Sequence, residues 1–169
     1  MFGDLNKSRI FANSAIFIGL VTLGGWVSLP FFPVPFTLQT LFVLLAGAVM
    51  RRNAIIPLGM YVFLGILGLP VFHNGVAGPG VLMGPTGGYL VGFIIAALIA
   101  GLAYEFESPY LHVIGFAAAT IAIYACGVTW MMYSMRIDFL PALVAGVLPF
   151  IPGDIVKAAA AYTIAKRLP

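Results

Sequence analysis

Asp154 and Lys157 are the residues whose types and spacing most directly suggest chemistry. They stand three positions apart in an otherwise apolar stretch that begins with Pro152-Gly153. Residues at this spacing share one face of a helix, and the proline and glycine place Asp154 in the first turn, where the helix dipole favours a negative charge. Because a charge at membrane depth costs about 2.5–3.5 kcal/mol on insertion scales, we expect the pair to recognise a polar ligand. An internal ion pair that pins the segment is the alternative.

Five further residues are weaker candidates for ligand contacts. Gln39 begins a predicted helix beside a proline-rich loop, and Asn74 lies in a second loop, so helix capping and turn formation are their alternatives. Thr86 and Tyr89 flank two glycines that let a ligand or another backbone approach closely. Phe36 could form the wall of an apolar pocket or anchor the chain at the membrane interface.

Motifs for other kinds of chemistry are missing from the sequence. A phosphate-binding loop needs glycines followed by Lys-Ser or Lys-Thr, and the glycine-rich stretch 80–86 contains no lysine. His73 and His112 occur without paired-cysteine or H-E-x-x-H spacing, so we expect neither a metal site nor a cofactor. Serine-nucleophile motifs are missing as well, and we therefore expect a protein that is not an enzyme.

The composition predicts that membrane-spanning helices hold these residues. Of the 169 residues, 62% are hydrophobic and only 8% are charged, whereas a soluble domain carries about 25% charged residues. The length suits about six spans of roughly 20 residues in a single transmembrane domain, 1–169. We predict spans at 8–29, 37–50, 53–69, 86–104, 110–133 and 153–167.

Loops and breaks set the ends of these spans. The prolines at 30, 33 and 35 favour an extended loop, and the linker 70–85 is apolar enough to pack against the bundle. Residues 139–150 are apolar but too short to span, and we predict a short helix or re-entrant segment there, with one long helix broken near 149–153 as the alternative. The predicted fold class is an all-α integral membrane bundle of six transmembrane helices.

Basic residues predict the orientation of this bundle. If six spans are counted, most of the basic residues fall on one side: Lys7, Arg9, Arg51, Arg52, Lys166 and Arg167. The positive-inside rule then places both termini in the cytoplasm of a multi-pass protein of the cell membrane. The proline-rich loop, the 70–85 linker and the 134–152 segment share the outer face.

Small residues recur along one stripe of the first predicted span, at Ser8, Ala12, Ala15 and Gly19. Small side chains let another helix approach closely. The stripe therefore either packs within the bundle or docks a partner subunit.

Four motifs, in order along the chain, resemble the BioY family, the biotin-binding S components of energy-coupling factor (ECF) transporters. They are Pro33-Val-Pro-Phe-Thr-Leu-Gln39, Gly68-Leu-Pro-Val-Phe72, Gly84-Pro-Thr-Gly-Gly-Tyr-Leu-Val-Gly-Phe93 and Pro152-Gly-Asp-Ile-Val-Lys157. The resemblance spans residues 8–167. It implies a six-helix membrane protein that binds biotin at its outer face and docks on a transmembrane coupling subunit driven by two ABC ATPase subunits. It also implies that the protein topples in the membrane to deliver its ligand.

The resemblance implies roles for individual residues as well. Asp154 and Lys157 match ligand contacts of the family, and Asn74 falls where the family supplies a further polar contact. S components commonly dock through an Ala-x-x-x-Ala pattern on the first span, from which this sequence departs with Ala12, Ala15 and Gly19. The expected partners are biotin, the coupling subunit, two ATPase subunits and the lipid bilayer, without nucleic acid.

The chemistry of biotin is consistent with the charged pair. Asp154 can accept from a ureido N–H, and Lys157 can donate to the ureido carbonyl or to the valerate carboxylate. The sequence leaves three alternatives open: a stand-alone biotin permease, an S component for a different small vitamin, and a membrane scaffold without a ligand.

Overall fold

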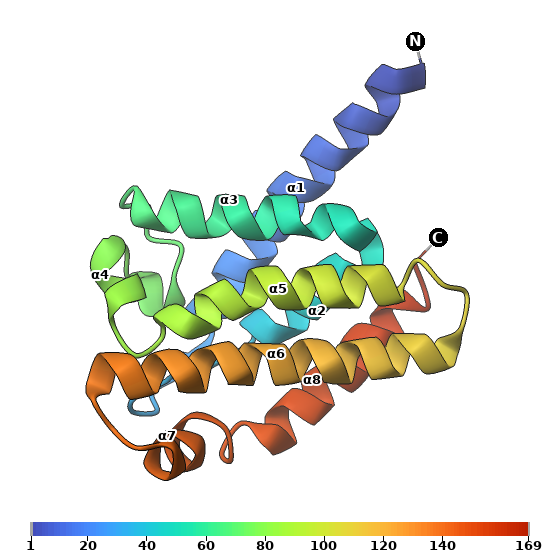
Figure 1. The fold of residues 1–169 in the computed structure, drawn as a ribbon. Helices are drawn as coiled ribbons and strands as arrows, with labels where there is room; N and C mark the ends of the chain where they lie inside the picture. The colour runs from blue at the N-terminus through green and yellow to red at the C-terminus, as the bar shows by residue number, and fades with distance from the viewer. Residues whose placement is uncertain (1, 169) are drawn as a thin grey trace.

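Apolar helices make up most of the chain, as the composition predicts. The structure is a computed structural model that describes residues 2–168. Its elements are α1 (Phe2–Trp26), β1 (Ser28–Leu29), β2 (Phe36–Thr37), α2 (Gln39–Met50), η1 (Arg51–Ala54), α3 (Ile55–Ile66), η2 (His73–Gly75), α4 (Pro79–Met83), α5 (Gly87–Ala103), α6 (Pro109–Met135), α7 (Phe139–Gly146) and α8 (Ile151–Ala165) (Figure 1). A helix therefore occupies each of the six segments that we predicted as spans.

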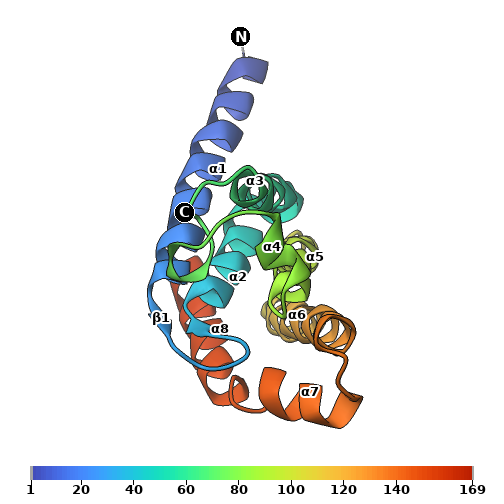
Figure 2. The same ribbon diagram turned by 90° about the vertical axis from the view of Figure 1, so that its left-hand side faces the viewer.

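The long helices form two layers. α3, α5 and α6 lie side by side in one layer, and α1, α2 and α8 cross behind them in the other (Figures 1 and 2). α2 is central, because it packs on α1, α5 and α8. The core lies between the layers, where Val43 and Leu44 of α2 and Leu58 and Tyr61 of α3 are fully buried.

Glycines let α5 and α6 approach closely. A Cβ atom added at Gly88 would lie 2.3 Å from the carbonyl oxygen of Cys126 and 2.3 Å from the Cβ of Trp130, both on α6. Near the other end of the pair, a Cβ at Gly115 would lie 2.2 Å from the Cβ of Ala103. The two backbones can pack at this distance only because these positions lack side chains.

Length and composition identify fewer spans than we predicted. Within residues 2–168, three helical stretches are long and apolar enough to cross a membrane: Asn6–Trp26, Gln39–Ile66 and Pro109–Met135. A fourth is added if α7 and α8, which are bent by 51° at their break, count as one span. α5 is apolar but shorter, and the stretch Gln39–Ile66 changes direction at Arg51, whose backbone is not helical (φ 54°, ψ −140°).

The segments between helices contain more structure than we predicted. α1 ends at Trp26 instead of continuing to residue 29, and Ser28–Leu29 pairs with Phe36–Thr37 as a short antiparallel ribbon. The prolines at 30, 33 and 35 keep the intervening loop extended, which favours this pairing. The linker 70–85 includes the short helical segments η2 and α4.

The predicted short segment before the last span is α7, Phe139–Gly146. A break at residues 147–150 follows, and α8 begins at Ile151 with Pro152 in its first turn. Proline is tolerated there because the first N–H groups of a helix have no partner within the helix. α8 therefore begins with exposed residues, Ile151 and Pro152, and Asp154 is the first of its residues that is buried.

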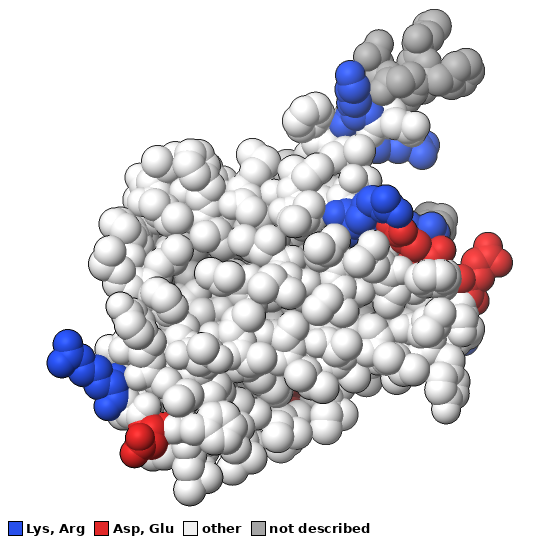
Figure 3. All heavy atoms as spheres, viewed as in Figure 1, with Lys and Arg blue, Asp and Glu red and all other residues white. Residues whose placement is uncertain are grey.

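Charged side chains gather at the ends of the molecule. Figure 3 shows an uncharged band across the middle of the visible face, with basic and acidic residues on either side of it. At one end, the guanidinium of Arg52 donates two hydrogen bonds of 2.6 Å to the carboxylate of Glu105, which ties η1 to the turn after α5. The contact raises the pKa of Arg52 and lowers the pKa of Glu105.

The α5–α6 contact supports a stability prediction. We expect Gly88→Ala to lower the free energy of unfolding by about 1–3 kcal/mol, because the added methyl overpacks the contact with α6. Gly59→Ala is the matched control, since no atom lies within 4 Å of a Cβ at that helical position. Thermal unfolding of both variants in detergent micelles, followed by circular dichroism, measures the difference. Equal midpoints would contradict the predicted close contact.

Candidate functional site

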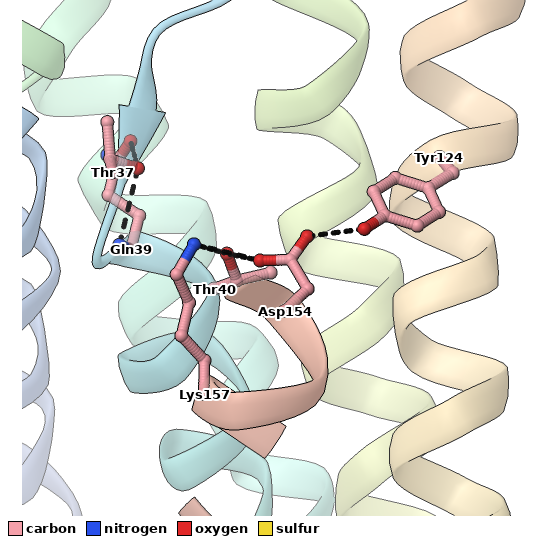
Figure 4. Close-up of polar contacts among 6 residues, drawn as sticks. All are labelled: Thr37, Gln39, Thr40, Tyr124, Asp154 and Lys157. Atoms are coloured by element: carbon pink, nitrogen blue, oxygen red, sulfur yellow. Dashed lines mark hydrogen bonds and ion pairs between the residues drawn. The ribbon is translucent and has the colours of Figure 1, made fainter. Parts of the chain in front are cut away.

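A buried ion pair lies at the N-terminal end of α8. The Nζ of Lys157 is 2.8 Å from Oδ1 of Asp154, and each residue is only 5% exposed. The hydroxyl of Thr40, on α2, donates to Oδ1 at 3.1 Å, and the hydroxyl of Tyr124, on α6, donates to Oδ2 at 2.5 Å. The carboxylate therefore joins three helices, as Figure 4 shows.

These partners explain how the charges can be buried. Removing a carboxylate and an ammonium from water is costly unless hydrogen bonds satisfy both groups. Asp154 accepts three of them, and the ammonium of Lys157 also lies 3.5 Å from Oγ1 of Thr40. The ammonium is 3.8 Å from the centroid of the Phe36 ring, which itself stacks on Phe150. The ring face adds a cation–π contact to the pair.

Gln39 belongs to a second polar cluster beside the ion pair. Its side-chain amide donates to the hydroxyl of Tyr61 at 2.6 Å and accepts from the hydroxyl of Thr37 at 3.1 Å. The backbone N–H of Gln39 donates to the same Thr37 oxygen at 3.3 Å, so the capping contact at the start of α2 comes from Thr37. Gly25 of α1 leaves room for the amide, because a Cβ there would lie 2.9 Å from it.

Thr86 and Tyr89 approach the site from the start of α5. Both are buried, and the hydroxyl of Tyr89 donates to the backbone carbonyl of Gly146 at 2.8 Å. This bond ties α5 to the end of α7, just before the break that leads into α8. The ring of Tyr89 lies against Gly127, where a Cβ would be 2.3 Å from it.

The two polar clusters and the start of α5 enclose one small cavity of about 50 Å³. Five of the residues predicted as ligand contacts line it: Asp154, Lys157, Gln39, Thr86 and Tyr89. Phe36 does not line the cavity but lies against Lys157. Asn74, which has a positive φ of 54°, is exposed on η2 outside the lining.

His73, rather than its neighbour Asn74, reaches this cavity from η2. Its Nδ1 is buried and has no hydrogen-bond partner among the described residues. Burial lowers the pKa of the imidazole, which keeps the ring neutral at neutral pH. A neutral ring nitrogen without a partner is a donor or an acceptor that a ligand can satisfy.

Four residues of the site were not identified from the sequence: Thr40, Tyr61, Tyr124 and His73. Thr40 and Tyr124 lie in helices whose sequences are otherwise apolar. Their hydroxyls bind Asp154, which is 114 and 30 positions away in the chain, so no local pattern reveals the contact. The one sequence signal for these residues was a polar side chain in the middle of an apolar helix. The packing of the helices decides which group that side chain binds.

The predicted docking residues lie on the outside of α1. Ala12, Ala15 and Gly19 are exposed, whereas Ser14 and Phe17 face the bundle. No atom lies within 4 Å of a Cβ added at Gly19. The small-residue stripe is therefore free to contact another helix, and packing within this bundle does not explain it.

Comparisons with known proteins agree with the resemblance. A model of the BioY family matches residues 3–169. A protein of Thermotoga maritima named "Biotin transporter BioY" is 40% identical over 162 residues, which cover 95% of each chain. A protein of Pyrococcus horikoshii named "Probable biotin transporter BioY" is 41% identical over 163 residues, covering 96% of this chain and 97% of that one.

The fold also matches a solved structure. The crystal structure of the S-component for biotin from an ECF-type ABC transporter superposes with a TM-score of 0.86 at 26% sequence identity. The match covers 96% of this chain and 91% of that chain.

The ion pair leads to a prediction about stability. We expect Lys157→Met to lower the free energy of unfolding by about 3–5 kcal/mol, because it leaves the carboxylate of Asp154 buried without its cation. The double variant Asp154→Asn/Lys157→Met should recover part of the loss, since it removes both charges. Unfolding of the two variants in mixed micelles measures the coupling. A double variant less stable than Lys157→Met would contradict the assignment.

Proposed function

Because the chain belongs to the BioY family, we propose that it is the high-affinity biotin-binding S component of an ECF-type vitamin importer. The observation that carries the proposal is the buried Asp154–Lys157 pair on the wall of a small cavity. A buried pair of opposite charges offers an acceptor and a donor side by side, which is what a ureido group requires. The relatives named as biotin transporters also support the proposal, because this chain matches them over nearly their whole length.

In the proposed complex, Asp154 accepts a hydrogen bond from a ureido N–H of biotin. Lys157 donates to the ureido carbonyl or to the valerate carboxylate. Gln39, Thr86 and Tyr89 provide further polar contacts, and the Phe36 ring provides an apolar wall beside Lys157. Asn74 adds a contact from η2 once the ligand is bound.

Binding requires the site to open, because its cavity is far smaller than the roughly 300 Å³ that small-molecule pockets usually provide. The β1–β2 ribbon and the segment from η2 to α4 are the movable parts, since they lie outside the two helix layers. The indole of Trp26 donates to the carbonyl of Pro70 at 3.0 Å, and this exposed bond ties the chain just before η2 to α1. The N–H of Gly78, between η2 and α4, donates to the carbonyl of Gly65 on α3 at 2.8 Å. Opening of this segment would have to break such bonds.

For the membrane, we propose six spans formed by α1, α2, α3, α5, α6 and α8, with both termini in the cytoplasm of a cell-membrane protein. The basic residues support this orientation, because Arg51, Arg52 and Lys166 lie at the ends of α2 and α8 that are remote from the cavity. The ligand site then faces the outside. α7 lies on the same side. With only eight residues it is too short to span the membrane.

We also propose that the transport energy comes from partners. Relatives and the matched structure are transport proteins by name, which supports a role without enzymatic activity. The partners would be a transmembrane coupling subunit and two ABC ATPase subunits. The exposed stripe of Ala12, Ala15 and Gly19 is the docking face on α1.

Binding of radiolabelled biotin to purified variants tests the site. We expect Asp154→Asn and Lys157→Ala each to weaken binding at least tenfold, because each removes a charge-assisted hydrogen bond worth about 1.5–3 kcal/mol. Asp138→Asn and Arg167→Ala are charge-matched controls at exposed positions and should bind as the wild type does. Wild-type affinity in both site variants would refute the assignment.

Uptake measurements test the transport role. Cells that produce this chain together with coupling and ATPase subunits should accumulate biotin, and cells that produce the chain alone should not. Equal uptake without the partners would favour a stand-alone permease. Mass spectrometry of small molecules retained after purification checks the ligand itself, and a different vitamin in place of biotin would point to an S component of another specificity.

A further inference from the structure

A second and larger cavity lies at the far ends of the helices that build the biotin site. It measures about 610 Å³ and is formed where α2, α5 and α8 end and α6 begins. Figure 1 shows the ends of α5 and α8 at the same side of the bundle as the start of α6. Lys166 is twelve positions after Asp154, which corresponds to about 18 Å along a helix. The two cavities are therefore separate.

Two cations line this cavity, Arg51 from η1 and Lys166 from the end of α8. Among the described residues, neither forms an ion pair with a carboxylate, whereas the neighbouring Arg52 is held by Glu105. The backbone of Arg51 has a positive φ of 54°, which is uncommon outside glycine. It is fixed there by close packing, because a Cβ at Gly101 would lie 2.3 Å from the Arg51 carbonyl oxygen. A backbone held in this conformation suggests a function for the side chain.

The rest of the lining is mainly apolar and aromatic, with Ala48, Val49, Tyr104, Tyr162 and Ala165 among its residues. Tyr104 stacks on His112, whose Nε2 lies 2.7 Å from the carbonyl oxygen of Phe106. The hydroxyl of Tyr104 is buried and has no hydrogen-bond partner among the described residues. Such a group is uncommon in a folded protein, and it leaves a hydrogen-bonding position on the lining that a water or a ligand can fill.

We propose that this cavity binds a membrane glycerophospholipid, with its phosphate between Arg51 and Lys166 and its glycerol region over Tyr104. Cationic side chains at the ends of apolar helices lie at the depth of the lipid headgroups, and they attract phosphate there. The apolar lining suits the start of the acyl chains, which a free phosphate ion lacks. Glu107 also lines the cavity, and its carboxylate can accept from an amine headgroup. Phosphatidylethanolamine is therefore the lipid that fits this set of charges.

Native mass spectrometry of the delipidated protein tests this proposal. With added phosphatidylethanolamine, we expect one retained lipid per wild-type chain. Arg51→Gly and Lys166→Gln should each weaken its binding at least tenfold; glycine suits the backbone conformation at position 51. Arg167→Ala is the matched control, since this neighbouring cation does not line the cavity. Glu107→Gln should remove the preference for phosphatidylethanolamine over phosphatidylglycerol.

Other occupants give different results. Inorganic phosphate at millimolar concentration should neither compete with the lipid nor raise the unfolding temperature, and equal stabilisation by phosphate would overturn the proposal in favour of a plain anion site. Unchanged lipid binding in both variants, with loss of assembly on the coupling subunit, would assign the cavity to a protein contact. The helical content of every variant, measured by circular dichroism, should equal that of the wild type, which shows that the variants fold whether or not the chain binds biotin.

Discussion

One carboxylate determines much of the arrangement of this bundle. Asp154 is buried among apolar helices, where an ionised group is tolerated only if its hydrogen bonds are filled. Its partners come from α2, from α6 and from its own helix. The bundle therefore cannot shift α8 relative to α2 or α6 without leaving a charge unsatisfied. The pair costs stability compared with an apolar core, and in return it fixes one register of helices, a role best attested for buried polar groups in coiled coils.

A chain of contacts connects this carboxylate to the outer loops. Thr40, which holds Asp154, follows Gln39, and Gln39 is bonded to Tyr61 on α3. Tyr61 packs edge-on against Phe72, and the Phe72 ring fits over Gly65, where a Cβ would lie 2.0 Å from it. Phe72 directly precedes His73 of the cavity lining. Packed side chains and hydrogen bonds therefore connect this loop to the ion pair without a gap.

Periodicity and composition predicted the local features well. The spacing of Asp154 and Lys157 predicted that they would share a face, and the structure agrees. The prolines predicted that the first helix would run to residue 29, but α1 ends at Trp26, because residues 28–29 pair with β2. The partners of Asp154 could not be predicted in the same way, because Thr40 and Tyr124 meet it only after three helices pack. The placement of Asn74 could not be predicted either: it is exposed, and its neighbour His73 lines the cavity. Resemblance to family motifs supplies part of the missing information, because related sequences share the same packed structure.

The ion pair has an electrical consequence. A lone charge moved across a bilayer gains or loses about 2.3 kcal/mol for every 100 mV of membrane potential. With Nζ of Lys157 only 2.8 Å from Oδ1 of Asp154, the pair is a small dipole without net charge. The membrane potential therefore exerts little net force on it at any depth in the bilayer. The carboxylate of a ligand such as the proposed biotin would be the one unpaired charge in the site on which the potential acts.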